Sequence, residues 1–447
     1  MSKINQNITP KTFISQIEFE YNLKNITVNN LPVWQFLRNL IYSKMLDGKP
    51  PQKRNLKSLF HFKKRSNHNK DKIEYVLFTD TNELIKIENN QHIDKISQNI
   101  INALNEQLLI VINPPNDINL KIENNQNIMS SSYFHLKRRT SIINKKYKID
   151  NELELKSICK KIDFDYYRYI KLFFTYHNIF NNWLDTINPK AVFVNCGYSL
   201  FHQALIYTCN IKNIKTLELQ HGLISDGHIQ YSPTKDIGKH TFPKYLLTFS
   251  DYYSQFINKH FIESSNLYPI GHYYRELKIK GENLECVELV RELRKKYKKI
   301  ILVSSQDIIE KELINSLNVI AKARPEYCFI FKPRKASTLC FNHQNILVDE
   351  KHSVYDFINL IDVNLSCFST NILESLSNRT IGILMDFSNL ASEYYSEIKK
   401  DCDTIFICKN NDEAITILDQ KIDNYNPPLF YNNNNKQNIE KILKHLS

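Results

Sequence analysis

The sequence predicts an α/β protein with two facing, doubly wound, Rossmann-like domains and an N-terminal helical extension. The chain has 447 residues, 42% of them apolar, which suffices for two or three domains. Short apolar runs typical of buried strands alternate with helical patterns in two series along the chain. Polar residues follow several of these strands, at the edge where open α/β sheets bind ligands.

We expect three segments. Residues 1–72 form an N-terminal helical cap, with a helical pattern over 12–46, followed by a basic linker. Residues 73–270 form the first α/β domain and residues 271–447 the second, with the break near Pro269-Ile270-Gly271. Residues 116–150 have weak periodicity and carry no prediction.

The elements of each domain follow from apolar runs bounded by Pro, Gly, Asn and Asp. In the first domain we expect strands at 74–78, 108–112, 191–194, 216–219 and 245–249, and helices at 94–104, 165–187 and 198–209. In the second we expect strands at 299–303, 327–331, 346–348, 363–366 and 380–385, and helices at 284–297, 309–323, 354–361, 371–377 and 438–446.

The composition excludes several classes of protein. No stretch reaches the roughly 18 apolar residues of a membrane helix, and the polar start lacks a signal-peptide core, so we expect a cytoplasmic protein. The nine cysteines form no C-x-x-C pair, which argues against a structural zinc site. The eight glycines never form G-x-G-x-x-G, and Gly222 and Gly227 are followed by His228 where a P-loop needs Lys. The H-E-x-x-H and G-x-S-x-G motifs are also absent.

The net charge of +12 is concentrated in one segment. Residues 49–72 carry nine Lys and Arg against only Asp71, a local balance of 9 − 1 = +8, with Phe60 and Phe62 among them. Two interpretations stay open. The segment could bind the inner face of an anionic cytoplasmic membrane, each basic residue adding about 1 kcal/mol, or it could be a solvated linker.

The stretch TLELQHGLISDGHIQY, residues 216–231, predicts a catalytic site at the edge of the first sheet. A short strand ends at Leu219, and Gly222 allows a tight turn directly after His221. An imidazole there can accept a proton near neutral pH, and Glu218 or Asp226 could orient it. The alternative is a buried histidine tied to a carbonyl. We take His221 as the candidate base.

In the second domain, polar residues at three strand ends predict a nucleotide-phosphate site. One strand ends with the cations Lys332 and Arg334, and Ser369 and Thr370 precede a helix after another strand. Each group also has a structural interpretation, as a helix cap or a solvated strand end. The candidate nucleotide-binding residues are Ser305, Gln306, Lys332, Arg334, Ser369, Thr370 and Glu374.

We expect neither a bound cofactor nor a required metal. The pairs Asp163/Asp165 and Asp401/Asp403 have the spacing of two metal ligands, but neither lies beside the predicted site. Two cations at one strand end would already neutralise a diphosphate.

Four motifs together resemble bacterial surface-polysaccharide glycosyltransferases of the GT-B type, which act in capsule or lipopolysaccharide assembly. They are E-L-Q-H-G with a following His and Tyr, the K-P-R strand end, the helix start S-T-N-x-x-E, and the opening helix V-W-x-x-x-R. The likeness covers about residues 183–386. More distantly, the pattern is similar to polysialyltransferases and teichoic acid glycerophosphotransferases, although Lys332-Pro333 stands where those have His-Pro.

The resemblance implies transfer of a sugar from a nucleotide-sugar donor to a glycan or lipid-linked glycan acceptor, with His221 as base. Two other hypotheses remain. One is a nucleotide-sugar epimerase of the same fold, which needs no acceptor. The other is a basic, non-enzymatic protein that binds nucleic acid or anionic polysaccharide; we rank it last, because it leaves the clustered site residues unexplained and we expect no nucleic-acid partner.

Overall fold

The chain forms two compact units. The computed structural model describes residues 9–47, 73–87, 91–113, 120–141, 145–281, 283–334, 341, 343–376, 380–421, 425–432 and 435–446. The first unit comprises Met1–His221, Ile229–Tyr273 and Asn434–Ser447, and the second comprises Gly222–His228 and Tyr274–Asn433. Each unit contains one parallel sheet, so the predicted class with two doubly wound, Rossmann-like domains is confirmed.

The first unit is organised around a seven-stranded parallel sheet, in the order β12-β11-β10-β9-β3-β6-β8. Its strands are β3 (Tyr75–Thr79), β6 (Leu108–Ile112), β8 (Ile128–Ser130), β9 (Ala191–Val194), β10 (Lys215–Leu219), β11 (Tyr245–Thr248) and β12 (Leu267–Pro269). The chain starts at β3, runs outward to β8, and then returns to the other side of β3. The strand order therefore reverses between β3 and β9. The carboxyl ends of these two strands form the switch point of the sheet.

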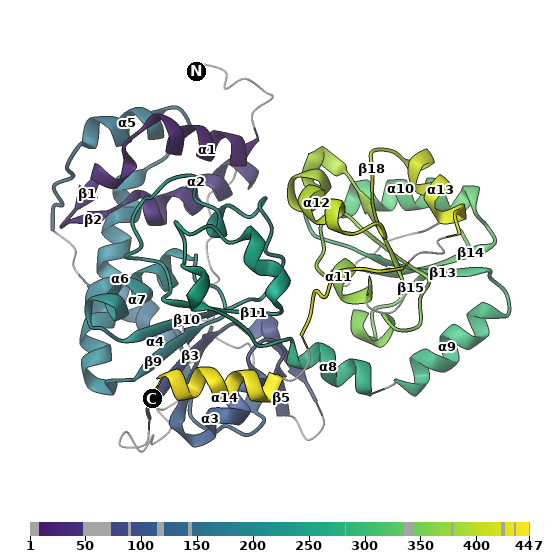
Figure 1. Cartoon of the computed structure of the whole chain (residues 1–447), viewed down its shortest axis with the longest axis horizontal. Helices are drawn as coiled ribbons and strands as arrows, with labels where there is room; N and C mark the ends of the chain where they lie inside the picture. Colours follow the sequence, from purple (N-terminus) through teal and green to yellow (C-terminus); the bar gives the residue numbers. More distant parts are fainter. Residues whose placement is uncertain are drawn as a thin grey trace. The chain divides into compact units, whose positions relative to one another are not determined.

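The first unit contains eight α-helices among its described residues, and α1 and α5 lie away from the sheet (Figure 1). They are α1 (Pro10–Glu20), α2 (Trp34–Asp47), α3 (Gln98–Leu104), α4 (Ser132–Thr140), α5 (Glu152–Lys160), α6 (Tyr166–Ile187), α7 (Leu200–Ile211) and α14 (Asn435–Leu446). Helix α6 begins where the Asp165 side chain accepts from the Arg168 N–H at 3.1 Å, and it ends at Asn188 in the left-handed conformation. Both α4 and α7 lie against α6.

The N-terminal region, where the sequence predicts a helical pattern over 12–46, is helical except for one short hairpin. A hairpin of β1 (Thr27–Val28) and β2 (Leu31–Pro32) separates α1 from α2. Its turn residues Asn29 and Asn30 have φ of 50° and 64°, which a tight hairpin turn requires and asparagine tolerates. A second small sheet holds β4 (Leu84–Lys86), β5 (Gln91–Asp94) and β7 (Lys121–Ile122).

The N-terminal helices are part of the first unit. Trp34 Nε1 and Arg38 Nε, both from the V-W-x-x-x-R motif, donate to Glu18 Oε1 at 3.1 and 2.6 Å. Burial alone would raise the pKa of Glu18, but Arg38 and Thr234 lower it. The basic segment 49–72 lies outside the described residues, so its membrane contact stays a prediction.

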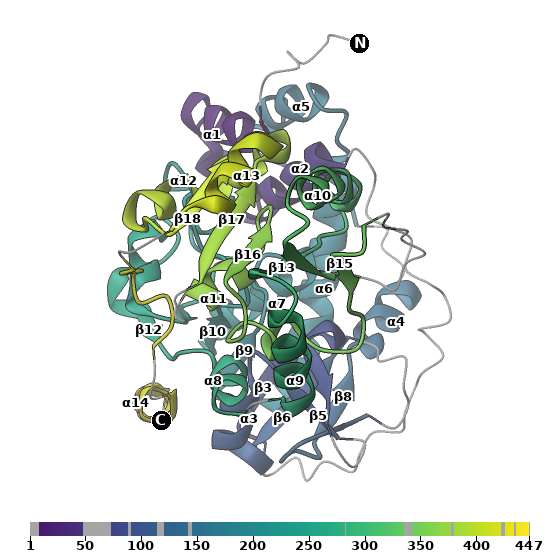
Figure 2. The same ribbon diagram turned by 90° about the vertical axis from the view of Figure 1, so that its right-hand side faces the viewer.

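The second unit has a six-stranded parallel sheet in the order β15-β14-β13-β16-β17-β18, which is the Rossmann order 3-2-1-4-5-6 (Figure 2). Its strands are β13 (Lys299–Ser304), β14 (Tyr327–Lys332), β15 (Ile346–Val348), β16 (Val363–Ser366), β17 (Ile381–Met385) and β18 (Ile405–Cys408). Its helices are α8 (Tyr273–Lys280), α9 (Leu284–Arg294), α10 (Glu310–Ala323), α11 (Asn371–Leu376), α12 (Leu390–Asp401) and α13 (Asn411–Asp419).

Both faces of this sheet are buried. Ile301 and Val303 of β13 pack with α10 and α13 on one face, while Ile300 and Leu302 pack with α9 on the other. This alternation follows from the two-residue period of a strand. The strand order of the second sheet reverses between β13 and β16, so the carboxyl ends of these two strands form its switch point.

Two features depart from the predicted segments. Helix α14 closes the chain but groups with the first unit, where Lys215 Nζ donates to the carbonyls of His445 and Leu446 at 3.1 and 3.0 Å. Figure 1 shows this helix against α3. Strands β12 and β18 and helices α12 and α13 were not predicted. In the part of the chain that the structure describes, no helix is long and apolar enough to cross a bilayer.

Candidate functional site

His221 lies just beyond the carboxyl end of β10, as the sequence predicts. It is half-buried, and its Nε2 atom lies 3.1 Å from the hydroxyl of Tyr198. Tyr198 comes from the loop between β9 and α7, which Ser199 fixes by capping α7. Burial lowers the pKa of His221, so its imidazole is mainly neutral at neutral pH and can accept a proton.

Glu218 is fully buried in β10, between Leu217 and Leu219. The hydroxyl of Tyr231 donates to its Oε1 at 2.9 Å. Burial raises the pKa of Glu218 to about 7, although hydrogen bonds from Gly197 and Tyr231 act against this rise. A Cβ at Gly197 would lie 2.4 Å from Glu218 Oε2, so glycine is what leaves room for the carboxyl.

The group that contacts His221 is therefore a tyrosine, where the sequence suggested Glu218 or Asp226. Glu218 contacts Tyr231, and Asp226 lies in the 222–228 loop, which groups with the second unit. Gly227 in that loop approaches α12 so closely that a Cβ would lie 2.2 Å from the carbonyl oxygen of Glu393.

The N-terminal helices hold Tyr231 in place. Arg38 Nη1 donates to the carbonyl of Ile229 at 2.6 Å, and Asn39 Nδ2 donates to Gln230 Oε1 at 2.6 Å. These bonds fix the two residues before Tyr231. The V-W-x-x-x-R helix thus supports the cluster around β10 without itself supplying a reacting group.

At the switch point of the second unit, the loops after β13 and β16 are joined by hydrogen bonds. Ser366 Oγ donates to the carbonyl of Ser304 at 2.8 Å, and Asn371 Nδ2 donates to Ser304 Oγ at 2.6 Å. The Phe368 N–H donates to Gln306 Oε1 at 3.1 Å. These bonds bring the predicted residues Ser305 and Gln306 onto the same sheet edge as the loop that carries Ser369 and Thr370.

Within that edge, Ser305 and Glu374 are buried, whereas Gln306, Ser369 and Thr370 are half-buried. Ser305 Oγ donates to Glu310 at 2.5 Å. Glu374 lies one turn into α11, and its carbonyl accepts from Arg275 Nη2 at 3.4 Å. The half-buried hydroxyls and amide are the groups that a phosphate or a sugar hydroxyl could reach.

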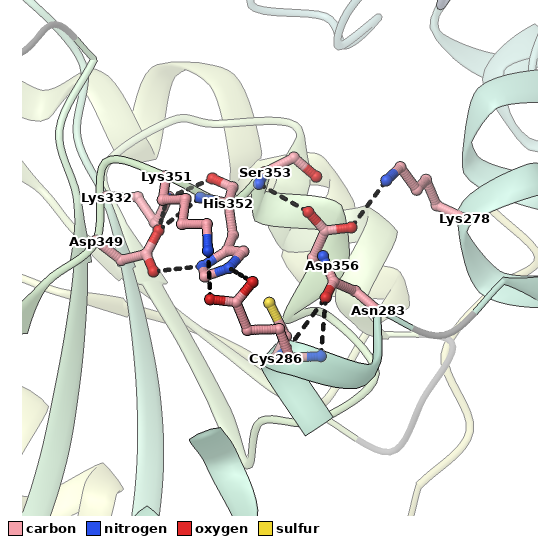
Figure 3. Close-up of polar contacts among 10 residues, drawn as sticks. Lys278, Asn283, Cys286, Lys332, Asp349, Lys351, His352, Ser353 and Asp356 are labelled. Atoms are coloured by element: carbon pink, nitrogen blue, oxygen red, sulfur yellow. Dashed lines mark hydrogen bonds and ion pairs between the residues drawn. The ribbon is translucent and has the colours of Figure 1, made fainter. Parts of the chain in front are cut away.

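Lys332 is directed elsewhere, into a polar cluster at the ends of β14 and β15 (Figure 3). Its ammonium is buried and ion-paired with Asp349, and it also donates to the carbonyl of His352. His352 Nδ1 lies 2.7 Å from Asp349 Oδ2. Burial alone would raise the pKa of Asp349, but the bonds from Lys332 and His352 lower it. Of the two predicted cations, only Arg334 is exposed.

Asp349 and His352 were not among the predicted site residues, nor were Tyr198 and Tyr231. Among the described residues, no group of three or more His, Cys, Asp and Glu is arranged to hold a metal ion. Asp165 of the Asp163/Asp165 pair caps α6.

No known family and no curated protein sequence matches the chain. Solved structures do match. The co-structure of MnaA from S. aureus with UDP aligns with a TM-score of 0.51 and 11% identity, over 83% of this chain and 95% of that one. The UDP-GlcNAc 2-epimerase from Methanocaldococcus jannaschii aligns with a TM-score of 0.50 and 12% identity, over 83% and 99%. The wall teichoic acid polymerase TagF aligns with a TM-score of 0.44 and 12% identity, over 85% of both chains. The first two likenesses establish that the chain has a fold of the GT-B type, with two Rossmann-like domains.

Proposed function

We propose that the protein is an enzyme that acts on a nucleotide sugar, and that its second unit binds the nucleotide. The observation that carries this proposal is the switch point between β13 and β16. Ligands of doubly wound sheets bind where the strand order reverses, and here hydroxyl- and amide-bearing loops meet at that edge. The likeness to the UDP-GlcNAc 2-epimerase from Methanocaldococcus jannaschii, and to MnaA from S. aureus in its co-structure with UDP, supports the same ligand class.

Within this class, epimerisation is the reaction that the solved structures support better. It requires removal and return of a proton, and His221 has the lowered pKa of a group that can accept one. Transfer to a surface glycan, as in capsule or lipopolysaccharide assembly, is the second candidate. It is supported by the E-L-Q-H-G, K-P-R and S-T-N-x-x-E motifs, and it also needs one base.

The ligand class is tested by calorimetry with UDP, CMP, CDP and GDP and their sugars. We expect at least one nucleotide to bind, and Ser369→Ala to weaken it by about 0.5–1.5 kcal/mol, the usual worth of a neutral hydrogen bond. The matched control is Ser316→Ala, in the middle of α10, because this serine is half-buried like Ser369 but lies away from the sheet edge. Absence of binding by every nucleotide, or equal loss in both variants, would contradict the proposed site.

The reaction is tested by following the sugar protons by NMR in D2O. Epimerisation without an acceptor replaces a carbon-bound proton of the sugar with deuterium. Transfer leaves those protons in place and releases the nucleotide only when a glycan acceptor is added. His221→Ala should lower the rate of either reaction by roughly 10² or more while nucleotide binding persists.

A further inference from the structure

A cavity of about 760 Å³ lies in the first unit, where four of its strands begin. Its lining includes Gln91 and Lys121, which are the first residues of β5 and β7. It also includes Ile128, the first residue of β8, and Asn105, which lies three residues before β6. The volume of this cavity is within the range of roughly 300–1,000 Å³ that is usual for small-ligand sites.

The cavity is separate from the site around His221. All strands of the first sheet are parallel, and β6, with its five residues, is roughly 16 Å long. His221 lies beyond the carboxyl end of β10, whereas the cavity lies at the amino ends of β6 and β8. The two places are therefore at opposite edges of the sheet.

Asparagine side chains fix the turn that forms one wall of the cavity. Asn125 is buried, and its Nδ2 atom donates to the carbonyls of Asn105 and Leu108 at 2.7 and 3.0 Å. Its Oδ1 atom accepts from the Asn127 N–H at 2.7 Å. Asn127 Nδ2 in turn donates to the carbonyl of Glu106 at 2.8 Å. Because these bonds tie the turn to the start of β6, the wall is formed before any ligand binds.

Amide groups with spare hydrogen-bonding capacity line this cavity. In the part of the chain that the structure describes, the side chains of Gln91, Asn105 and Gln126 make no hydrogen bond to the protein. Asn124 and Asn127 donate through Nδ2, and their Oδ1 atoms accept no bond from a described residue. An amide can both donate and accept, which suits a ligand that is rich in hydroxyl groups.

The remaining lining residues narrow the ligand class. Among the described residues of the lining, only Lys121 and Glu106 are charged, and their opposite charges do not favour an anion such as a phosphate. The same residues include no aromatic ring on which a nucleobase could stack. Leu120, Ile122 and Ile128 supply apolar surface beside the amides. A sugar ring has the matching pattern, since it carries C–H groups on its faces and hydroxyls around its rim.

We infer that this cavity binds an uncharged saccharide, whose ring lies on the apolar residues while its hydroxyls bond to the amides. The inference is carried by unused amides beside apolar side chains, in a cavity whose wall is already fixed. It does not depend on the proposed reaction, because the cavity lies at the edge of the sheet opposite His221.

The test is a titration of the full chain followed by saturation-transfer difference NMR, with no nucleotide present. The probes are two uncharged disaccharides, lactose and N,N′-diacetylchitobiose. A cavity variant combines Gln91→Ala with Gln126→Ala. A control variant combines Gln16→Ala with Gln255→Ala, at two exposed glutamines of the first unit that do not line the cavity.

We expect at least one disaccharide to bind the parent and the control variant with the same affinity. The cavity variant should bind it about 10-fold more weakly, because it lacks two side chains that can form neutral hydrogen bonds, while its circular dichroism spectrum is unchanged. The inference is overturned if neither disaccharide binds the parent, if the cavity variant binds like the parent, or if both variants lose affinity equally. Nucleotide binding is measured separately, so these outcomes leave the proposed function standing.

Discussion

Glu218→Gln should change how the stability of the first unit depends on pH. In the folded protein, burial raises the pKa of Glu218 to about 7, whereas an unfolded glutamate titrates near 4.5. Between these pH values the unfolded chain loses a proton that the folded chain keeps. The stabilisation from this group is therefore complete below pH 4.5, declines as the pH rises, and is lost above about pH 7.

The size of the effect follows from the two pKa values. Their difference, about 7 minus 4.5, corresponds to about 3 kcal/mol at about 1.4 kcal/mol per pH unit. Glutamine has no proton to lose and can still accept from the Tyr231 hydroxyl. The stability of the variant relative to the wild type should thus improve by about 3 kcal/mol between pH 4.5 and pH 7.5.

Tryptophan fluorescence during urea unfolding measures this change in the first unit, which contains Glu218. The chain has two tryptophans, Trp34 in α2 and Trp183 in α6, and both are buried in the first unit. Other groups with shifted pKa, such as the buried Asp94, are common to both proteins and cancel in the difference. Glu154→Gln, at an exposed position on α5, is the matched control for the loss of one carboxylate. A constant difference between the Glu218 variant and wild type across this range would refute the assignment of a protonated buried carboxyl.

Three further predictions concern both units. Tyr198→Phe should lower turnover about 10-fold and shift the pH–rate profile, because it removes the hydroxyl that contacts His221. An unchanged profile would show that this contact does not affect the titration of His221. Lys332→Met should destabilise β14 by about 3–5 kcal/mol, since the buried Asp349 loses its ammonium partner and keeps only the bonds from His352, and adding Asp349→Leu should restore most of the protection measured by amide hydrogen exchange. Arg334→Ala should weaken nucleotide binding by about 1.5–3 kcal/mol if the exposed guanidinium contacts a phosphate; calorimetry with equal affinities would remove it from the site.

The parallel strands were predictable because strands buried on both faces are short and continuously apolar. The run Ala191–Val194 is an example, since all four residues are buried and the expected limits match β9. The hairpin between α1 and α2 was missed because its strands have two residues each, too few to show a period. In the structure, the antiparallel pairing of β1 with β2 and the φ angles of Asn29 and Asn30 show the turn. Helix α14 shows a second limit of the sequence. Its apolar pattern predicts a helix, but it does not tell which of the two units the helix packs against.

The site around β10 was predictable in its position but not in its contacts. His221 lies after a strand end, where the sequence places it. Its partner Tyr198 is 23 residues away on another strand's loop, and nothing in its local sequence marks it. Gly197 was the available signal: a glycine three residues after the end of a buried strand indicates a close approach, which here is the approach of Glu218.

The interpretation of Lys332 shows why a cation at a strand end does not by itself identify a phosphate site. Such a lysine can face the ligand edge or pair with a carboxylate on the neighbouring strand, and strand register decides between them. In the structure, Phe331 of β14 pairs with Val348 of β15, so the next residue on each strand, Lys332 and Asp349, are also neighbours. The 13 residues between Lys332 and Ile346 carry no pattern that fixes this register. Once the pair is formed, the ammonium is neutralised and buried. Among the described residues, the exposed Arg334 and the half-buried hydroxyls after β16 are then groups at the edge of this sheet that can meet an anionic ligand.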